Sequence, residues 1–231
     1  MDIRTRVEKA FGRWKGSPPE VITRLPQSGS DRVYFRLICR EDQVIGAYNP
    51  SREENEAFVG FSNHFRSKGL PVPEIYVYYP DEKIYFLEDL GDINLFTWLA
   101  RRTDEERFNE ETEALFLTIA GDLVRIQIEG IRGLDLSLCY PHRSFDRQSI
   151  VWDMNYYKYM FLKLIGAPFN ETRLERDFEI LTRFLLDAGQ EYFLFRDFQT
   201  ANIMILDGKP WYIDYQGGRL GAPQYDIASL T

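Results

Sequence analysis

The sequence predicts an α+β protein with two lobes, because strand patterns fill its first part and helix patterns fill the rest. From about residue 22 to residue 90, short runs of alternating polarity dominate, which is typical of strands. After residue 91 the apolar residues recur at helical spacing. Strands followed by helices indicate an α+β fold. We therefore expect a small strand-rich N-lobe in residues 1–90 and a helical C-lobe in residues 91–231.

The composition is that of a globular protein with a substantial core. Of 231 residues, 44% are hydrophobic and 15% are aromatic, enough for one large domain or two lobes. The formal net charge of −8 argues against a nucleic-acid or anionic-membrane partner, which a basic surface would bind. No apolar run approaches the roughly 20 residues of a membrane span. The N-terminal MDIRTRVEKAFGRWKG is too charged for a signal peptide.

Cysteine and histidine are too sparse for several classes of site. Cys39 and Cys139 form no disulfide framework or metal pattern, so we expect a reduced, cytoplasmic setting. The two histidines, His64 and His142, are not spaced as a pair of metal ligands. Histidine-based zinc sites and Ser-His-Asp chemistry are therefore disfavoured. Carboxylates must carry any acid–base chemistry.

The N-lobe elements follow from local patterns. A short N-terminal helix is predicted from the spacing of Val7, Phe11 and Trp14. Strands are predicted in DRVYFRLICR (31–40), QVIGAYN (43–49), IYVYY (75–79) and KIYFLEDL (83–90). In the first strand, one face is apolar and consists of Val33, Phe35, Leu37 and Cys39.

One helix interrupts these strands, and both of its ends are marked. Ser51 and Glu54 have the spacing of a capping box. An apolar stripe follows, made of Phe58, Phe61 and Phe65, and the helix ends at Gly69 and Pro71. Three more helices are predicted in the C-lobe: one up to Gly130, and two in residues 146–165 and 171–188. The first of these carries the apolar series Leu115, Ile119, Leu123 and Ile126.

The segment FRDFQTANIMILDGKPWYIDYQ (195–216) places polar side chains among apolar strand residues. Asp207-Gly208, between NIMIL and PWYID, is a strong hairpin signal. With that turn, the register of the ladder brings Asn202 opposite Ile213, one residue before Asp214. Asn202 and Asp214 would then meet at the open end of the hairpin.

The oxygen atoms in this segment suggest a chemistry. An amide oxygen beside a carboxylate is a hard-oxygen site suited to Mg²⁺. Asp197, five residues before Asn202, can face the same place as a base that accepts a hydroxyl proton. Asp-x₄-Asn, a hairpin and then Asp is the arrangement used for kinase-type phosphoryl transfer. The alternative is structural: Asp197 and Asn202 cap a loop, and Asp214 ends a strand.

These segments resemble a known family. FRDFQTANIMI (195–205) and YIDYQGGRLGAPQYDIASL (212–230) are similar to the catalytic and metal loops of the aminoglycoside phosphotransferase/choline kinase superfamily. Within it, the nearest likeness is to the bacterial N-acetylmuramate/N-acetylglucosamine anomeric kinases of cell-wall recycling. The likeness extends to SGSDRVYFRL (28–37), LPVPEIYVYYPDEKIYFLEDLGD (70–92) and FDRQSIVWDMNYYKYM (145–160).

The resemblance implies a protein-kinase-like fold that holds ATP between its lobes, with Mg²⁺ as the cofactor. It implies transfer of the γ-phosphoryl group to a hydroxyl, above all that of an amino sugar. It also implies Asp197 as the base and Asn202 and Asp214 as the metal ligands. Asp226 matches a family aspartate that braces the catalytic loop, a structural role. The expected partners are thus ATP and a small-molecule acceptor, a sugar, and neither nucleic acid nor a membrane.

The chain departs from the family pattern at three places. Phe195 stands where a scaffolding histidine is usual, and Asp214-Tyr215-Gln216 stands where protein kinases have Asp-Phe-Gly. The strand that should supply a phosphate-binding lysine, QVIGAYN, contains neither lysine nor arginine. Arg32 or Arg36 on the preceding strand could supply this charge. Without a strand lysine to orient, Glu54 is expected to cap its helix.

Two segments are predicted to contact the nucleotide. SGSDR (28–32) lies where a nucleotide-covering loop belongs, which assigns phosphate contacts to Ser28, Gly29, Ser30 and Arg32. An ordinary Ser/Gly turn is the alternative. FLEDLG (86–91) is where the chain should pass between the lobes, with backbone groups of Glu88 and Leu90 at the adenine edge. An ordinary strand end is the alternative there.

Contacts with the acceptor are predicted in one aromatic-rich segment of the C-lobe. In the resembled superfamily the helix matching WDMNYYKYM (152–160) borders the acceptor pocket, which makes Asp153, Asn155 and Tyr156 candidate sugar contacts. Core packing is the alternative for this aromatic stretch. A cluster made of Gly217, Gly218 and Gly221 lacks the G-x-G-x-x-G spacing and is interpreted as turn chemistry.

Two functions remain open from the sequence. One is an ATP-dependent small-molecule kinase, and the other is a nucleotide-binding pseudokinase or regulatory module of a longer protein. The missing lysine favours the second, as does QYDIASLT, which has only begun a helix where the resembled kinases continue. We accordingly expect a C-lobe that is truncated or continued elsewhere. The intact set of Asp197, Asn202 and Asp214 favours the enzyme, because a binding module has no need for a base.

Overall fold

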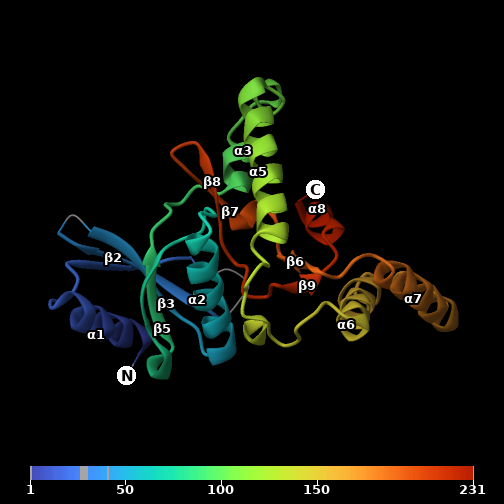
Figure 1. Ribbon diagram of the computed structural model, residues 1–231, viewed down its shortest axis with the longest axis horizontal. Coiled ribbons are helices and arrows are strands. Elements are labelled where there is room, and N and C mark those ends of the chain that lie inside the picture. The colour runs from blue at the N-terminus through green and yellow to red at the C-terminus, as the bar shows by residue number, and fades with distance from the viewer. Residues whose placement is uncertain (1, 27–30, 41, 231) are drawn as a thin grey trace.

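The computed structural model describes residues 2–26, 31–40 and 42–230 (Figure 1). The first part of the chain forms helix α1 (Ile3–Lys15), strands β1 (Val21–Arg24), β2 (Val33–Cys39) and β3 (Asp42–Tyr48), helix α2 (Arg52–Ser67), strand β4 (Ile75–Tyr79), the 3-10 turn η1 (Pro80–Glu82) and strand β5 (Ile84–Glu88). These strands make one antiparallel sheet in the order β1-β2-β3-β5-β4. All of the strands predicted in residues 31–90 are present.

Helices α1 and α2 cover opposite faces of this sheet. The odd-numbered residues of β2 are all buried, as their alternation predicts, and they pack with Val7 and Phe11 of α1. Trp14 completes the predicted helix face by stacking on Phe86 of β5 at 5.3 Å between ring centroids. On the other face, α2 packs its phenylalanines against Ala47 and Leu87. Strand β3 is therefore buried on both faces over residues 44–47.

The rest of the chain is mainly helical. It contains α3 (Leu95–Ala100), α4 (Asp104–Arg107), α5 (Glu110–Ile128), the 3-10 turn η2 (Leu136–Leu138), α6 (Arg147–Tyr157), the π-helical turn η3 (Lys158–Leu162), α7 (Glu171–Leu186) and α8 (Gln224–Leu230). The three helices predicted here match α5, α6 with η3, and α7. All four predicted core positions of α5 are buried. Helices α6 and α7 lie at the end of the molecule farthest from α1 (Figure 1).

Two short ladders lie among these helices. Strand β6 (Tyr192–Leu194) pairs with β9 (Arg219–Gly221). After the 3-10 turn η4 (Thr200–Asn202), β7 (Ile203–Leu206) pairs with β8 (Lys209–Tyr212) through the predicted two-residue turn. The turn chemistry expected of the glycine cluster holds at Gly217, but Gly221 pairs with Tyr192 as part of a strand. Strands β6 and β9 are distant in sequence, so no local turn signal predicts that they pair.

One buried cluster joins the two parts of the chain. It contains residues of β3, α2 and β5 together with residues of α5, β6, β7 and β8. At its centre, Phe65 of α2 lies 5.1 Å from Phe193 of β6 and 5.5 Å from Tyr215, measured between ring centroids. Helix α2 thus holds the sheet onto the loops that follow β6 and β8. The lobe division at residue 90 stays a prediction.

We predict that Phe65→Ala destabilises the protein by about 3–5 kcal/mol, because it leaves a cavity at the contact between the two parts of the chain. The measurement is the free energy of unfolding in urea. Phe96→Ala on α3 is the control, since that ring is 63% exposed and should change stability by about 0.5 kcal/mol or less. Equal losses in the two variants would contradict this role for α2.

Candidate active site

The loop between β6 and β7 carries Asp197 and is held from beneath by a buried carboxylate. Asp226 is fully buried at the start of α8. Its carboxylate accepts hydrogen bonds from the backbone N–H groups of Phe195 and Arg196, each at 2.9 Å, and from Gln127 Nε2 at 2.9 Å. Burial raises the pKa of Asp226, while these three donors favour its charged form. The contacts are those of a brace beneath the loop.

Within this loop, Asp197 and Asn202 are tied together through the backbone. The carbonyl oxygen of Asp197 accepts from Gln199 N at 2.8 Å and from Asn202 Nδ2 at 2.9 Å. The side-chain amide of Asn202 is thereby anchored through its nitrogen. Its oxygen is left for another partner, because an amide offers one donor end and one acceptor end.

The hairpin register agrees with the sequence prediction. Leu206 pairs with Lys209 across the Asp207-Gly208 turn. At the open end of the ladder, Ile213 N donates to Asn202 O at 3.1 Å. Asp214 is the next residue, as the predicted register requires.

Asn202 and Asp214 line the same cavity, which has a volume of about 200 Å³. The cavity is bordered by the start of β7, the end of β8, and the chain after β5. Asp214 has a positive φ of 69°, which a residue with a side chain adopts only at some energetic cost. Its side chain is 40% exposed, so a carboxylate oxygen remains accessible from the cavity.

Asp197 lies close to this pair. A Cβ atom added to Gly217, three residues after Asp214, would be 3.9 Å from Asp197 Oδ2. Burial raises the pKa of the Asp197 carboxyl, and the negative charge of Asp214 raises it further, while Arg196 opposes both effects. The three side chains predicted to carry the chemistry are therefore brought together. A half-buried carboxylate beside two hard oxygen ligands can accept a proton next to a bound divalent cation.

The chemistry of the donor set fits Mg²⁺. Asn202 and Asp214 offer an amide oxygen and a carboxylate oxygen to one cavity, and Mg²⁺ uses one or two such protein ligands while keeping waters and phosphate oxygens. In the described part of the chain no group of three or more His, Cys, Asp or Glu residues is arranged to hold a metal ion by itself.

Comparison with known proteins decides the family. Residues 21–231 match the model of the phosphotransferase enzyme family. The chain belongs to this family. The membership inferred from the catalytic and metal loops is thereby confirmed.

Two curated relatives of this chain carry the same name, N-acetylmuramate/N-acetylglucosamine kinase. The one from Neisseria meningitidis serogroup B is 27% identical over 163 residues, which are 69% of this chain and 45% of the relative. The one from Pseudomonas aeruginosa is 24% identical over 222 residues, which are 94% of this chain and 61% of the relative. The matched region thus spans about half to three fifths of these relatives.

The fold is shared with solved phosphotransferases. A ternary complex of aminoglycoside phosphotransferase APH(4)-Ia with ADP and hygromycin B matches with a TM-score of 0.63 at 17% identity, covering 96% of this chain and 75% of that one. This likeness confirms the predicted α+β, kinase-like fold. Within the described residues, no helix is both long and apolar enough to cross a membrane.

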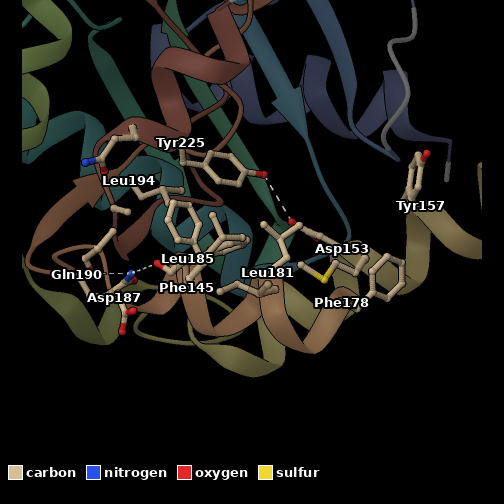
Figure 2. Close-up of a pocket in the computed structure, with 16 residues that line it drawn as sticks. Phe145, Asp153, Tyr157, Phe178, Leu181, Leu185, Asp187, Gln190, Leu194 and Tyr225 are labelled. Atoms are coloured by element: carbon tan, nitrogen blue, oxygen red, sulfur yellow. Dashed lines mark hydrogen bonds between the residues drawn. The ribbon is translucent and has the colours of Figure 1, made fainter. Parts of the chain in front are cut away.

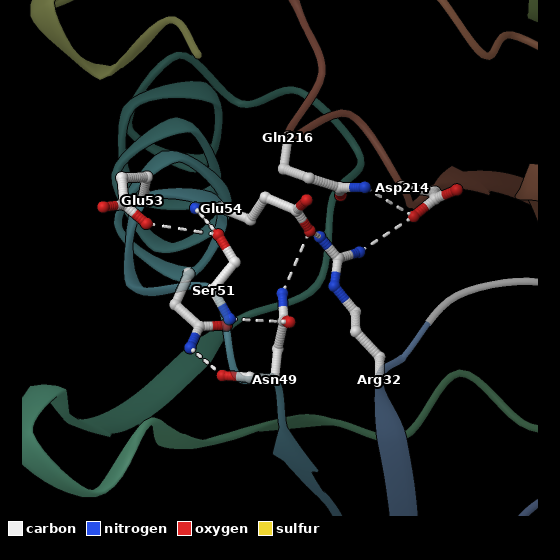
Figure 3. A network of polar contacts seen from close by, with 8 residues as sticks. Arg32, Asn49, Ser51, Glu53, Glu54, Asp214 and Gln216 are labelled. Carbon is white, nitrogen blue, oxygen red and sulfur yellow. Dashed lines mark hydrogen bonds and ion pairs between the residues drawn. The ribbon is translucent and has the colours of Figure 1, made fainter. Parts of the chain in front are cut away.

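A buried arginine next to β2 pairs with Asp214. Arg32, immediately before β2, donates to Asp214 Oδ1 at 3.0 Å and to Glu54 Oε2 at 2.9 Å (Figure 3). Arg36 instead donates to Asp89 and Asp92, near the end of β5. Of the two arginines that could replace the missing lysine, Arg32 is the one that faces the site.

The expectation that Glu54 caps its helix is wrong for its side chain. Ser51 Oγ accepts from Glu54 N at 3.2 Å, which is half of the predicted capping box. The Glu54 carboxylate turns away and accepts from Arg32, and from Asn49 Nδ2 at 3.0 Å. The charge-assisted hydrogen bond to the almost fully buried Arg32 stabilises the Glu54 carboxylate more than a hydrogen bond to the N-terminus of its helix would.

The predicted nucleotide contacts are only partly within the described residues. Ser28, Gly29 and Ser30 lie outside them. Glu88 and Leu90 line the cavity that contains Asn202 and Asp214. Asp89 between them accepts from Arg36, from Gln43 Nε2 at 2.8 Å and from Gly91 N at 2.9 Å. The connection after β5 is thus held in one conformation from the neighbouring strands.

A larger cavity of about 730 Å³ lies between α6, α7 and the start of α8 (Figure 2). This larger cavity is mostly apolar, and its lining contains none of Asp197, Asn202 and Asp214. We therefore assign the chemistry to the smaller cavity, which Asn202 and Asp214 line. Asp153 lines the larger cavity, where the Tyr225 hydroxyl approaches its Oδ2 at 3.5 Å, and it also pairs with Arg196 at 3.3 Å. Asp153 therefore lies between this cavity and the loop that carries Asp197.

The other two candidate acceptor contacts are placed differently. Asn155 and Tyr156 do not line this cavity, and Tyr156 is 69% exposed. Helix α6 presents Tyr157 to the cavity instead (Figure 2). Which side of α6 faces the cavity determines these contacts. The sequence of α6 has no clear apolar stripe that would have indicated that side. Their roles as sugar contacts stay predictions.

Sequence reasoning missed Gln216, which donates from Nε2 to Asp214 Oδ1 at 2.8 Å. It also missed the left-handed conformation of Arg196, whose φ is 79°. The sequence shows a glutamine where protein kinases have the glycine of Asp-Phe-Gly. It does not show that this glutamine contacts Asp214, because that contact depends on how the loop folds. No local signal marks a positive φ at an arginine.

We predict that Asp226→Asn lowers the free energy of unfolding by about 1–3 kcal/mol or more. One end of the new amide is a donor, so at least one of the buried donors it meets loses its acceptor. Urea unfolding measures the change. Asp177→Asn, at an exposed position on α7, is the control and should shift stability by about 0.5 kcal/mol or less. Similar unfolding midpoints for the two variants would rule out a bracing role for Asp226.

Proposed function

We propose that this phosphotransferase transfers the γ-phosphoryl group of ATP to a hydroxyl of an amino sugar, with Mg²⁺ as the cofactor. The observation that carries the proposal is that Asn202 and Asp214 line one cavity while Asp197 lies near enough to Asp214 for the two charges to interact. Phosphoryl transfer needs little covalent chemistry from the protein and depends on positioning and charge. A base, two hard oxygen ligands and a fixed loop supply these requirements.

In this proposal each side chain has one task. Asp197 accepts the proton of the acceptor hydroxyl, and burial beside Asp214 raises its pKa toward the working range of a base. Asn202 and Asp214 hold the metal, which when bound neutralises charge on the phosphate oxygens. Asp226 keeps the loop around Asp197 in place through two backbone N–H groups.

The nucleotide is proposed to occupy the smaller cavity. Glu88 and Leu90, whose backbone groups are proposed to meet the adenine edge, line this cavity. Arg32 lies at the Asp214 end and is proposed to assist the phosphates together with residues 28–30. The lobe boundary at residue 90 and the cytoplasmic setting remain predictions that accompany this proposal.

The amino-sugar acceptor is supported by the two relatives named as N-acetylmuramate/N-acetylglucosamine kinases. Their identity of 24–27% and partial coverage make the acceptor a proposal for this chain. Asp153 is the best-placed candidate contact, because it joins the larger cavity to Arg196 beside the base. A carboxylate there can accept hydrogen bonds from sugar hydroxyls.

The alternative is a nucleotide-binding module without transfer activity. The missing strand lysine favoured this alternative. Arg32, which pairs with Glu54 and Asp214, supplies a positive charge at the site and so weakens that argument. A binding module also has no need of a half-buried carboxylate in the place of a base. The enzyme is therefore the function that the geometry supports best.

MgATP should raise the melting temperature of the full natural chain, because a ligand that binds only the folded state stabilises it. The gain is about 2.7 kcal/mol at one hundred times the dissociation constant. Asp214→Ala should abolish the Mg²⁺-dependent part of the shift. Differential scanning fluorimetry with and without Mg²⁺ measures it. No shift of the wild-type protein at millimolar MgATP would contradict nucleotide binding.

Asp197→Asn should lower turnover by about 10²–10⁴-fold, because it keeps the size of the side chain and removes the base. MgATP affinity should change little, since Asp197 faces the acceptor. ADP release is measured against N-acetylglucosamine, N-acetylmuramate, neutral sugars and choline-like alcohols, with Asp177→Asn as the control. Wild-type turnover in the Asn variant would show that another group is the base. A wild-type protein with no acceptor-dependent ADP release would support the binding module.

A further inference from the structure

Arg32 joins three segments that are far apart in the sequence. It lies immediately before β2, Glu54 lies in the first turn of α2, and Asp214 follows β8, 182 residues after Arg32. The arginine side chain is only 2% exposed, while Glu54 is 38% exposed and Asp214 is 40% exposed. Figure 3 shows the guanidinium between the two carboxylates, one on either side. The buried charge is thus neutralised by partners that each keep access to solvent.

An arginine is suited to this bridge and a lysine is not. The planar guanidinium presents several N–H groups in a fixed fork, so one side chain can donate to two carboxylates in different directions. Nη1 donates to Asp214 and Nη2 donates to Glu54. Strand β3 ends at Tyr48, which pairs with Val33 beside Arg32. The next residue, Asn49, also donates to Glu54. Arg32 and Asn49, on either side of this pair, thus both donate to Glu54.

The contacts of Asp214 are divided unequally between its two oxygens. Oδ1 accepts from Arg32 Nη1 at 3.0 Å and from Gln216 Nε2 at 2.8 Å. Within residues 2–26, 31–40 and 42–230, no hydrogen bond is found to Oδ2. Asn202 is similarly held through Nδ2, which leaves its oxygen free in the same described part of the chain. Each candidate metal ligand is thus anchored through one atom and presents another.

We propose that Arg32 and Gln216 are positioning residues that fix Asp214 through Oδ1, so that Oδ2 is presented to the cavity. Through Glu54, Arg32 also makes this orientation depend on the position of α2. The assignment rests on the proposed function, since it concerns the metal site of the same reaction. Groups that orient a metal ligand by hydrogen bonding commonly change metal affinity by about 10–100-fold when removed. A purely structural ion pair would change stability and leave metal affinity alone.

The decisive measurement is the affinity for Mn²⁺ in the presence of ATP, with the acceptor omitted, by calorimetric titration of the full natural chain. Arg32→Met should weaken Mn²⁺ binding by about 10–100-fold. Arg32→Lys should recover part of the loss, because it restores the charge but cannot bridge both carboxylates. Gln216→Met, which keeps the side-chain volume, should also weaken binding, and it serves if Arg32→Met does not fold.

Lys158→Met is the matched control. Lys158 in η3 is also only 2% exposed and also contacts two carboxylates, those of Glu171 and Glu175, but it lies outside the site. Its removal should lower the melting temperature and leave Mn²⁺ affinity unchanged.

Two outcomes would overturn the assignment, and they can be told apart. Wild-type Mn²⁺ affinity in folded Arg32→Met and Gln216→Met would overturn it while leaving the proposed function intact. A wild-type protein that binds neither ATP nor Mn²⁺ would overturn the proposed function together with this assignment.

Discussion

The arrangement of the site depends on the packing of Tyr215 against helix α2. The ring is fully buried and stacks on Phe58 at 5.0 Å between centroids, and its hydroxyl shares a 2.6 Å hydrogen bond with Ser62. Burial raises the pKa of this phenol, so it stays neutral and can donate that bond. Asp214 is the preceding residue in the chain. Because its neighbour is fixed in the core, the carboxylate can hold an energetically costly backbone conformation and still point into the cavity.

The same aromatic cluster holds the loop between β6 and β7, where the family resemblance predicts a histidine at position 195. Phe195 occupies that position, fully buried, and lies 5.1 Å from Phe198 and 5.7 Å from Tyr215 between ring centroids. The backbone N–H of Phe195 is held by Asp226. A loop anchored by apolar packing at the side chain and by a carboxylate at the backbone needs no scaffolding imidazole. The position of Asp197 is thus fixed by the ring packing of Phe195 and by the hydrogen bond from Phe195 N to Asp226.

Strand β2 serves two purposes because side chains alternate along a strand. Its odd-numbered residues pack under α1 in the core of the sheet. On the other face, Tyr34 lines the smaller cavity, and Arg32 and Arg36 donate to Asp214 and Asp89, which line the same cavity. Arg32 holds the loop that carries Asp214, and Arg36 holds the connection after β5. The strand therefore links the geometry of both ends of the candidate nucleotide site to the same hydrophobic core.

The sequence alone determined the elements whose signals are local. The stripe of α2 and the alternation of β2 follow from periodicity, and Asp207-Gly208 set the register that brings Asn202 opposite Ile213. Only the tertiary structure decided which arginine faces the site and where the Glu54 carboxylate points. It also decided that Gln216 supports Asp214 and that Gly221 belongs to a strand. Periodicity and turns involve residues a few positions apart, whereas the choice between a helix cap and an ion pair depends on a guanidinium buried by segments up to 182 residues away.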